Sequence, residues 1–186
     1  NALQESGCER ILLAPLYPQY CAATTATVVD KANDWLAAQR WQPSLRTLPP
    51  YHDDPLYIDA LAADIDRQLG TLDFDPELLL MSFHGMPART LQLGDPYHCH
   101  CQKTARLLEA KLARPGLRFR TSFQSRFGPA KWLEPATDAV LEEEARGGTK
   151  RLAIVAPGFS ADCLETLEEL AIQGREQFTD AGGEQF

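Results

Sequence analysis

Residues 78–85, Leu-Leu-Leu-Met-Ser-Phe-His-Gly, form the most apolar run in this chain. A run of this length, closed by Gly85 and Pro87, is typical of a strand buried on both faces of a parallel sheet. Open α/β sheets build their ligand sites just outside the carboxyl ends of their strands. His84 is therefore placed for chemistry, although a histidine after a strand can also be a simple hydrogen-bonded turn residue.

Short β-like runs alternate with amphipathic helical stretches on both sides of this segment. The pattern predicts strands over residues 10–15, 44–48, 78–83, 117–123 and 151–156. Helices are predicted after a cap at Thr24 or Thr25, from Asp53 or Asp54 to Gly70, over about 102–113, over 137–146, and from about 161. This alternation predicts an α/β fold, with one Rossmann-like parallel sheet covered by helices on both faces.

The composition bounds the class of protein. The 186 residues, 44% hydrophobic and 24% charged, suit a single globular domain. A net charge of −8, without a basic cluster, argues against a nucleic-acid partner. No apolar stretch approaches the roughly 20 residues that cross a bilayer, and the first residues lack a secretory pattern. With five scattered cysteines, which suit reduced thiols, we expect a cytoplasmic protein.

Three of the predicted strands should deliver unusual segments to one edge of the sheet. These segments are 82–85, 122–129 followed by Trp132, and 156–160. The carboxyl ends of parallel strands meet at one edge. We therefore expect an apolar slot lined by the aromatic residues Phe83, Phe127, Trp132 and Phe159.

The helix after the fifth strand carries an acidic face. At 100° per residue, one arc should face the core and a second should hold the carboxylates of Asp162, Glu165 and Glu169. The core arc would comprise Cys163, Leu164, Leu167, Leu170 and Ala171. The acidic arc fits a solvated face favoured by the helix dipole. Together with His84 it also fits a site for a borderline metal such as Fe²⁺, with a histidine able to accept a weakly acidic proton.

Five strings, in order along the chain, resemble the ferrochelatase family, whose members insert Fe²⁺ into protoporphyrin. They are Pro-Leu-Tyr-Pro-Gln-Tyr (15–20) with Thr24-Thr25, Ser-Phe-His-Gly-Met-Pro (82–87), Gly-Asp-Pro-Tyr (94–97), Phe-Gln-Ser-Arg-Phe-Gly-Pro (123–129) with Trp132-Leu133 and Pro135, and Pro-Gly-Phe-Ser-Ala-Asp-Cys-Leu-Glu-Thr-Leu-Glu-Glu (157–169). The resemblance covers about residues 10–186. It implies a class II chelatase that makes protohaem and releases two protons, a lyase acting in haem biosynthesis.

The resemblance also assigns roles to residues. His84 corresponds to the active-site histidine and Glu165 to the acid that faces it, and both, with Glu169, are implied metal contacts. The implied porphyrin contacts are Trp132, Phe83, Tyr97, Arg126 and Phe159. Arg126 fits equally a porphyrin propionate or a surface carboxylate. Many relatives carry a histidine where this chain has Cys163, which we expect to be structural.

By resemblance, residues 1–186 form one Rossmann-like domain, the second, metal-binding half of a ferrochelatase. The amino-terminal domain and a carboxy-terminal strand and helix are expected to be absent, so the isolated piece should be inactive. Two alternatives stay open: a non-catalytic module that binds metal or tetrapyrrole, and a related cobalt chelatase. The expected partners are porphyrin and ferrous iron. We expect a monomer, with peripheral membrane contact only in the intact enzyme.

Some ferrochelatases hold a [2Fe-2S] cluster through four cysteines. Here Cys99 and Cys101, flanked by His98 and His100, form the only dense group of such ligands. Because C-x-C is not a recognised four-ligand spacing, we expect no cluster, and no cofactor beyond the substrate iron. The group is expected to be solvent-facing and to lead into a helix.

Overall fold

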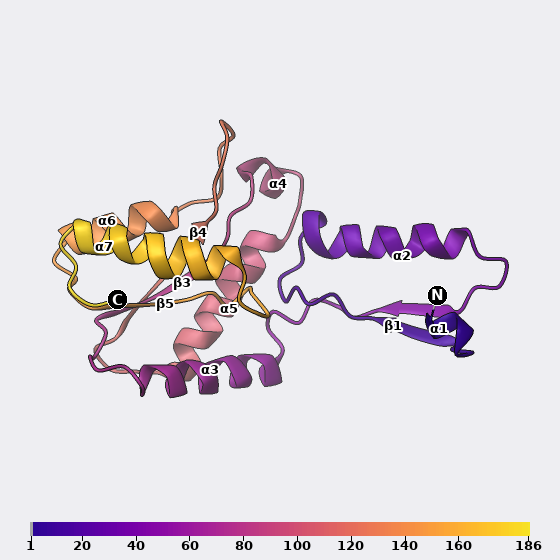
Figure 1. The fold of residues 1–186 in the computed structure, drawn as a ribbon, viewed down its shortest axis with the longest axis horizontal. Coiled ribbons are helices and arrows are strands. Elements are labelled where there is room, and N and C mark those ends of the chain that lie inside the picture. The colour runs from indigo at the N-terminus through magenta and orange to yellow at the C-terminus, as the bar shows by residue number, and fades with distance from the viewer. Residues whose placement is uncertain (1) are drawn as a thin grey trace.

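The computed structural model describes residues 2–186 and places the five strands in two parallel sheets. In one, β1 (Arg10–Leu13) pairs with β2 (Ser44–Thr47). In the other, the order is β4 (Arg118–Gln124), β3 (Leu78–His84), β5 (Leu152–Val155), as Figure 1 shows. The α/β class is confirmed, but the expectation of one sheet is wrong. Both edges of β3 are already taken by β4 and β5, and β1 and β2 alternate between exposed and half-buried positions, unlike a central strand.

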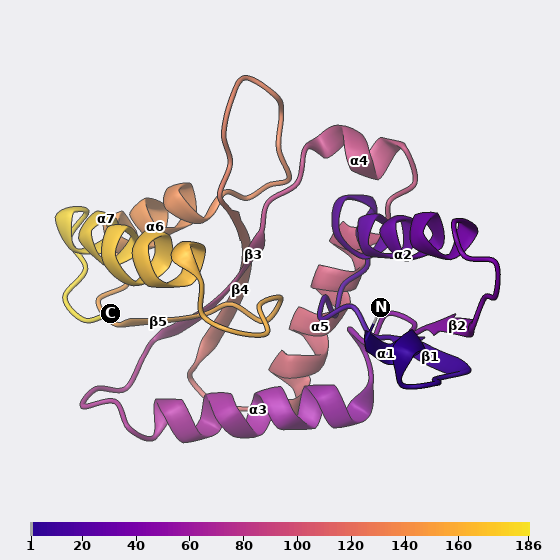
Figure 2. The same ribbon diagram turned by 45° about the vertical axis from the view of Figure 1, so that its right-hand side comes forward.

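Helices cover both faces of the three-stranded sheet. Side chains of β3 alternate between the faces, and all except His84 are buried. Leu79, Met81 and Phe83 pack toward α3 (Pro55–Leu69) and α5 (Tyr97–Leu112). Leu78 and Leu80 pack toward α6 (Thr137–Arg146) and α7 (Arg175–Asp180). Figure 2 shows α3 and α5 on one side of these strands and α6 and α7 on the other. The apolar run thus forms the centre of the core.

The remaining helices are short or peripheral. They are α1 (Ala2–Glu5), the π-helix η1 (Ala22–Ala26), α2 (Thr27–Ala37), α4 (Ala88–Gln92) and the π-helix η2 (Glu165–Gly174). None of the described helices is both long and apolar enough to cross a membrane.

Helix caps were partly predictable. Asp54 caps α3 by accepting hydrogen bonds from Leu56 and Tyr57, Pro55 follows it, and Gly70 is the C-cap, as predicted. The predicted cap at Thr24 or Thr25 is wrong. Both threonines lie inside η1, whose N-cap is Cys21, and the Cys21 Sγ accepts a 3.4 Å hydrogen bond from the Ala23 amide.

The acidic helix is a π-helix, and this overturns the predicted core arc. Leu164 and Leu167 are 70% and 56% exposed, and Ala171 is exposed as well. Of the predicted arc, Leu170 is buried and Cys163 is half-buried. The other buried or half-buried positions of η2 are Glu165, Thr166, Glu169 and Gly174. Hydrogen bonds from i to i+5 widen each turn, so a count at 100° per residue assigns the wrong face.

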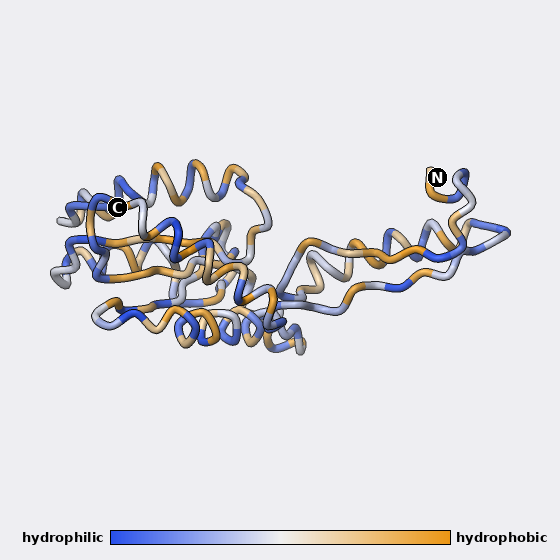
Figure 3. Tube along the Cα trace, turned by 90° about the horizontal axis from the view of Figure 1, so that it is seen from below, coloured by the Kyte–Doolittle hydropathy of each residue, from blue (hydrophilic) through white to orange (hydrophobic). Residues whose placement is uncertain are grey.

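The unit built from β1, β2 and α2 projects from the body of the molecule (Figures 1 and 3). Helix α2 has no buried residue. The unit meets the body at α5, where the Tyr20 amide donates to His100 Nδ1 (3.1 Å) and Thr104 Oγ1 donates to the His52 carbonyl (2.8 Å). The His52 and His100 rings stack with centroids 3.6 Å apart.

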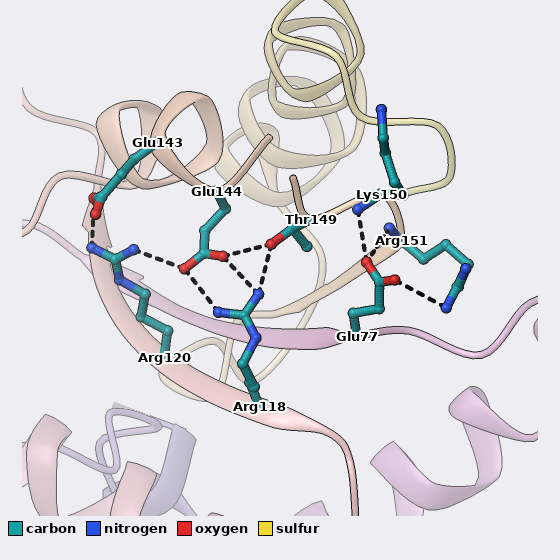
Figure 4. Close-up of polar contacts among 8 residues, drawn as sticks. All are labelled: Glu77, Arg118, Arg120, Glu143, Glu144, Thr149, Lys150 and Arg151. Atoms are coloured by element: carbon teal, nitrogen blue, oxygen red, sulfur yellow. Dashed lines mark hydrogen bonds and ion pairs between the residues drawn. The ribbon is translucent and has the colours of Figure 1, made fainter. Parts of the chain in front are cut away.

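A charged cluster ties β4 to α6 at the end of the sheet away from His84 (Figure 4). Arg118 and Arg120 each donate to the carboxylate of Glu144, which also accepts from Thr149 Oγ1 at 2.7 Å. A second group lies beside it, where Glu77 accepts from the amide of Lys150 and pairs with Arg151. These contacts hold the amino-terminal end of β4 and leave its carboxyl end to the site.

Candidate active site

His84 ends β3 with its imidazole held in one orientation. Its Nδ1 lies 2.7 Å from the Gly85 carbonyl oxygen, which can only accept, so Nδ1 carries the proton of the neutral ring. The lone pair on Nε2 is then free to accept a proton or bind a metal ion. The Tyr97 hydroxyl donates a hydrogen bond of 2.8 Å to the His84 carbonyl, and this bond fixes the backbone as well.

Gly85 is required by the close approach of β4. A Cβ at this position would lie 2.6 Å from the Gln124 carbonyl oxygen and 3.2 Å from Trp132 Cε3. The Gly85 amide uses this closeness to donate a 2.7 Å hydrogen bond to the same carbonyl. The strand end that carries His84 is therefore locked to the end of β4.

A mostly apolar cavity of about 440 Å³ opens beside His84. One wall comes from the carboxyl ends of β3 and β5, with His84, Phe159 and Glu165. The other wall is the segment after β1, which contributes Leu16, Tyr17, Thr24 and Val28. This second wall was not predicted. The string at 15–20 with Thr24-Thr25 was a signal for it, but the threonines were predicted only as a helix cap.

Glu165 begins η2 and lines the same cavity as His84. Its pKa lies below the ordinary value, first because the Cys163 side chain hydrogen-bonds to the carboxylate and also because His84 attracts the negative charge. At neutral pH the Glu165 carboxylate is thus ionised beside the His84 ring. Cys163 is half-buried and acts on Glu165, which adds a role to the structural one expected from the sequence.

Glu169 points to a different, polar cavity of about 170 Å³. Its carboxylate accepts from the Ser125 amide (2.6 Å) and the Ser125 hydroxyl (2.5 Å). Within residues 2–186 there is no group of three or more His, Cys, Asp or Glu side chains arranged to hold a metal ion. His84, Glu165 and Glu169 therefore do not form one coordination sphere in this structure.

The predicted porphyrin contacts are distributed unevenly around the cavity. Phe159 and Tyr97 line it, and the Phe159 ring centroid lies 6.4 Å from that of His84. Phe83 is 0% exposed because its position on β3 turns it into the core, where it packs beneath Gly158. It can support the wall but not touch a ligand there.

Trp132 and Arg126 lie on the loop after β4, outside the cavity lining. The Trp132 ring packs on Phe127, and its Nε1 donates a hydrogen bond of 2.9 Å to the Phe127 carbonyl oxygen. Arg126 pairs with Asp138 at 2.8 Å, the surface-carboxylate alternative left open by the sequence.

Cys99 and Cys101 lie inside α5, which begins at Tyr97, earlier than predicted. Cys99 is exposed, whereas Cys101 is fully buried, so the expectation of a solvent-facing group is wrong for Cys101. Residues two apart on a helix point to different sides, which accounts for the difference.

The fold and the site define a parallel α/β protein with a cavity at its strand ends, where an imidazole and a carboxylate share one wall. The sequence matches the ferrochelatase family model over residues 1–186, and the chain belongs to this family. It is 62% identical over 186 residues to a ferrochelatase of Rhizobium meliloti (strain 1021), covering all of this chain and 55% of the relative.

Two further relatives give the same result. The ferrochelatase of Agrobacterium fabrum is 58% identical over 186 residues, all of this chain and 54% of the relative. That of Methylocella silvestris is 50% identical over 184 residues, 99% of this chain and 53% of the relative. The chain thus spans about half the length of the curated relatives it matches.

Proposed function

We propose that this chain forms the metal-binding side of an enzyme that inserts Fe²⁺ into protoporphyrin IX, giving protohaem and two protons. The proposal rests on one observation above others: in a chain of the ferrochelatase family, His84 with a free Nε2 and an ionised Glu165 line the same apolar cavity. Porphyrin and ferrous iron are the substrates. The activity is that of a lyase.

In the proposed reaction, His84 Nε2 accepts a pyrrole proton or holds the incoming iron. Imidazole and carboxylate together suit Fe²⁺ better than an all-oxygen or all-thiolate set. Glu165 balances the charge from the same cavity wall as His84, and Glu169, held by Ser125, lies farther along η2 as an acceptor for protons or cations that leave. Phe159 and the segment after β1 press on the macrocycle, and binding energy spent on bending it lowers the barrier to metal entry.

The test requires the rest of the protein. A chimera in which residues 1–186 replace the matching segment of the Rhizobium meliloti ferrochelatase should insert iron into protoporphyrin, followed by absorbance. His84→Ala should reduce the rate by about 10²-fold or more, the range for a general base. His98→Ala, an imidazole outside the cavity, is the matched control. A His84→Ala chimera within about tenfold of its parent would refute the central role.

For the isolated 186-residue chain we propose binding without turnover. Both walls of the cavity come from this chain, which favours ligand binding by the piece alone. Quenching of tryptophan fluorescence by porphyrin, with absorbance to detect metal insertion, separates the possibilities. Turnover by the isolated chain would contradict the proposal.

We also propose that the protein holds no [2Fe-2S] cluster and is a cytoplasmic monomer, with peripheral membrane contact in the intact enzyme. The divergent directions of Cys99 and Cys101 on α5 support the absence of a cluster. The purified chimera should show no cluster absorbance, and a Cys99→Ser, Cys101→Ser double variant should have the same iron content. Light scattering tests the monomer, and cell fractionation tests the cytoplasmic location and the membrane contact.

A further inference from the structure

A buried chain of hydrogen bonds runs beneath the site. It joins Ser82 on β3, Ser122 and Gln124 on β4, and Thr137 at the start of α6, and all four residues are at most 4% exposed. The Ser82 hydroxyl donates a hydrogen bond of 2.9 Å to Gln124 Oε1. The Thr137 Oγ1 atom lies 2.8 Å from the Ser82 hydroxyl and 2.9 Å from Ser122 Oγ. Buried polar side chains are costly unless every one is satisfied, so such a network fixes geometry.

The hydrogen bonds of this network can be donated in only one order. Because Ser82 uses its proton on Gln124, it accepts from Thr137, which in turn accepts from Ser122. The Gln124 amide is therefore oriented with Oε1 toward Ser82 and Nε2 toward η2. There Nε2 donates a 3.2 Å hydrogen bond to the Glu165 carbonyl oxygen.

Gln124 thus contacts both halves of the site. Its backbone carbonyl accepts the Gly85 amide, directly after His84, and its side chain holds the first residue of η2, Glu165. Its side chain is not part of the lining of the His84 cavity but of the neighbouring polar cavity. It is therefore placed to act on the reacting groups without touching the substrate.

We propose that Gln124 is a positioning residue that sets the imidazole of His84 against the carboxylate of Glu165, with Ser82 fixing the direction of its amide. This inference rests on the proposed iron insertion. A small error in the placement of a reacting group lowers the rate of the chemical step more than it changes substrate binding.

The test is a double-variant cycle in the chimera. Gln124→Met keeps the length and volume of the side chain but removes the donor, and should lower kcat about tenfold with the porphyrin KM within about threefold. Glu165→Gln removes the group that Gln124 positions. If Gln124 acts through Glu165, the double variant should be no slower than Glu165→Gln alone.

Glu144→Gln is the matched control, since it breaks a buried polar cluster at the other end of β4. Glu144→Gln should reduce kcat only slightly. In the double variant with Glu165→Gln the two fold-reductions in kcat should multiply, because the two sites are independent. Multiplication of the Gln124→Met and Glu165→Gln effects, or a kcat for Gln124→Met within about twofold of the parent, would overturn the proposal. If Gln124→Met does not fold, Ser82→Ala replaces it, because it keeps the amide but removes the hydroxyl that orients it.

Amide hydrogen exchange of the same chimeras gives a readout besides activity. In Gln124→Met the segment 165–174 should exchange faster, while 140–146 in α6 should not change. If the unmodified chimera inserts no iron, the proposed function fails, and exchange alone decides the positioning role. Unchanged exchange of 165–174 then overturns it, and faster exchange supports it.

Discussion

The Tyr97 hydroxyl and the His84 carbonyl are joined by a 2.8 Å hydrogen bond, which links the start of α5 to the end of β3. Tyr97 is only 8% exposed, so it reaches the cavity mainly as part of its frame. The role implied by resemblance, a porphyrin contact, is therefore accompanied by support of the backbone at His84.

Replacing Tyr97 with phenylalanine should separate these two roles. Tyr97→Phe keeps the ring but leaves the His84 carbonyl without its donor, at a cost of about 1 kcal/mol in the free energy of unfolding. In the chimera, kcat should fall several-fold with little change in porphyrin KM, measured by steady-state insertion assays. A changed KM with unchanged kcat and stability would instead identify Tyr97 as a substrate contact.

Glu165 and Glu169 of η2 should differ in importance, because they line different cavities. Glu165→Gln removes the negative charge on the cavity wall that also carries His84 and should lower kcat by about 10²-fold, as expected for a group acting on the reacting atoms. Glu169→Gln should cost about tenfold less than this, since its carboxylate is held by Ser125 away from His84. Equal losses for the two variants in the same assay would contradict this order.

The sequence was most informative where local chemistry dictates structure. The run at 78–83 is buried whichever partners it finds, and Asp54, Pro55 and Gly70 bound α3 through backbone hydrogen bonds and fixed dihedrals. Convergence of β3, β4 and β5 follows from their parallel pairing. These features depend on neighbours in sequence or on burial alone.

Tertiary contacts decided what the sequence did not show. A π-helix looks like an α-helix in a residue pattern, so the exposure of Leu164 and Leu167 was not predictable from spacing. The division into two sheets depends on which strand edges meet, and propensity does not encode this. His84 and Glu165 were predicted as a pair, but the wall formed by Leu16 and Tyr17 required the three-dimensional arrangement.

Glu144 should contribute strongly to stability at the far end of the sheet. Its side chain is 9% exposed, and burial alone would raise its pKa, but hydrogen bonds from Arg118, Thr149 and Arg120 lower the pKa to about 2. Glu144→Gln should therefore reduce the free energy of unfolding by about 2 to 3 kcal/mol, less than for a fully buried pair because Arg118 is 54% exposed.

The pH dependence of this contribution has a definite sign. A carboxyl whose pKa is lowered in the folded state stabilises above its unfolded value, near 4.5, and loses that effect as the pH falls toward 2. Urea unfolding between pH 3 and pH 6 should show a smaller slope for Glu144→Gln than for the parent chain. Parallel stability curves would show that Glu144 is not responsible.

The stacked His52 and His100 rings should make the junction of the β1–β2 unit sensitive to acid. Burial is the main reason that the pKa values of both histidines are lowered, and the pKa of His52 is lowered further by His100. Lys103 also lowers both pKa values, whereas Asp53 raises them and Asp95 raises that of His100. A histidine with a lowered pKa stabilises the fold fully above the unfolded value, near 6.5, and this contribution is lost as the pH falls below it. Protonation of His100 Nδ1 would also break its hydrogen bond from the Tyr20 amide.

Unfolding of the 186-residue chain by urea should therefore become easier between pH 7 and pH 5. His100→Gln supplies a neutral side-chain oxygen that can still accept from the Tyr20 amide, and it removes one of the two charges that would meet across a 3.6 Å stack. The variant should have a flatter dependence on pH over this range. The His98 ring stacks on Phe123 instead, so His98→Ala should keep the parent's dependence of stability on pH. An equally steep loss in His100→Gln would place the acid sensitivity elsewhere, because the stacked pair would then not be its source.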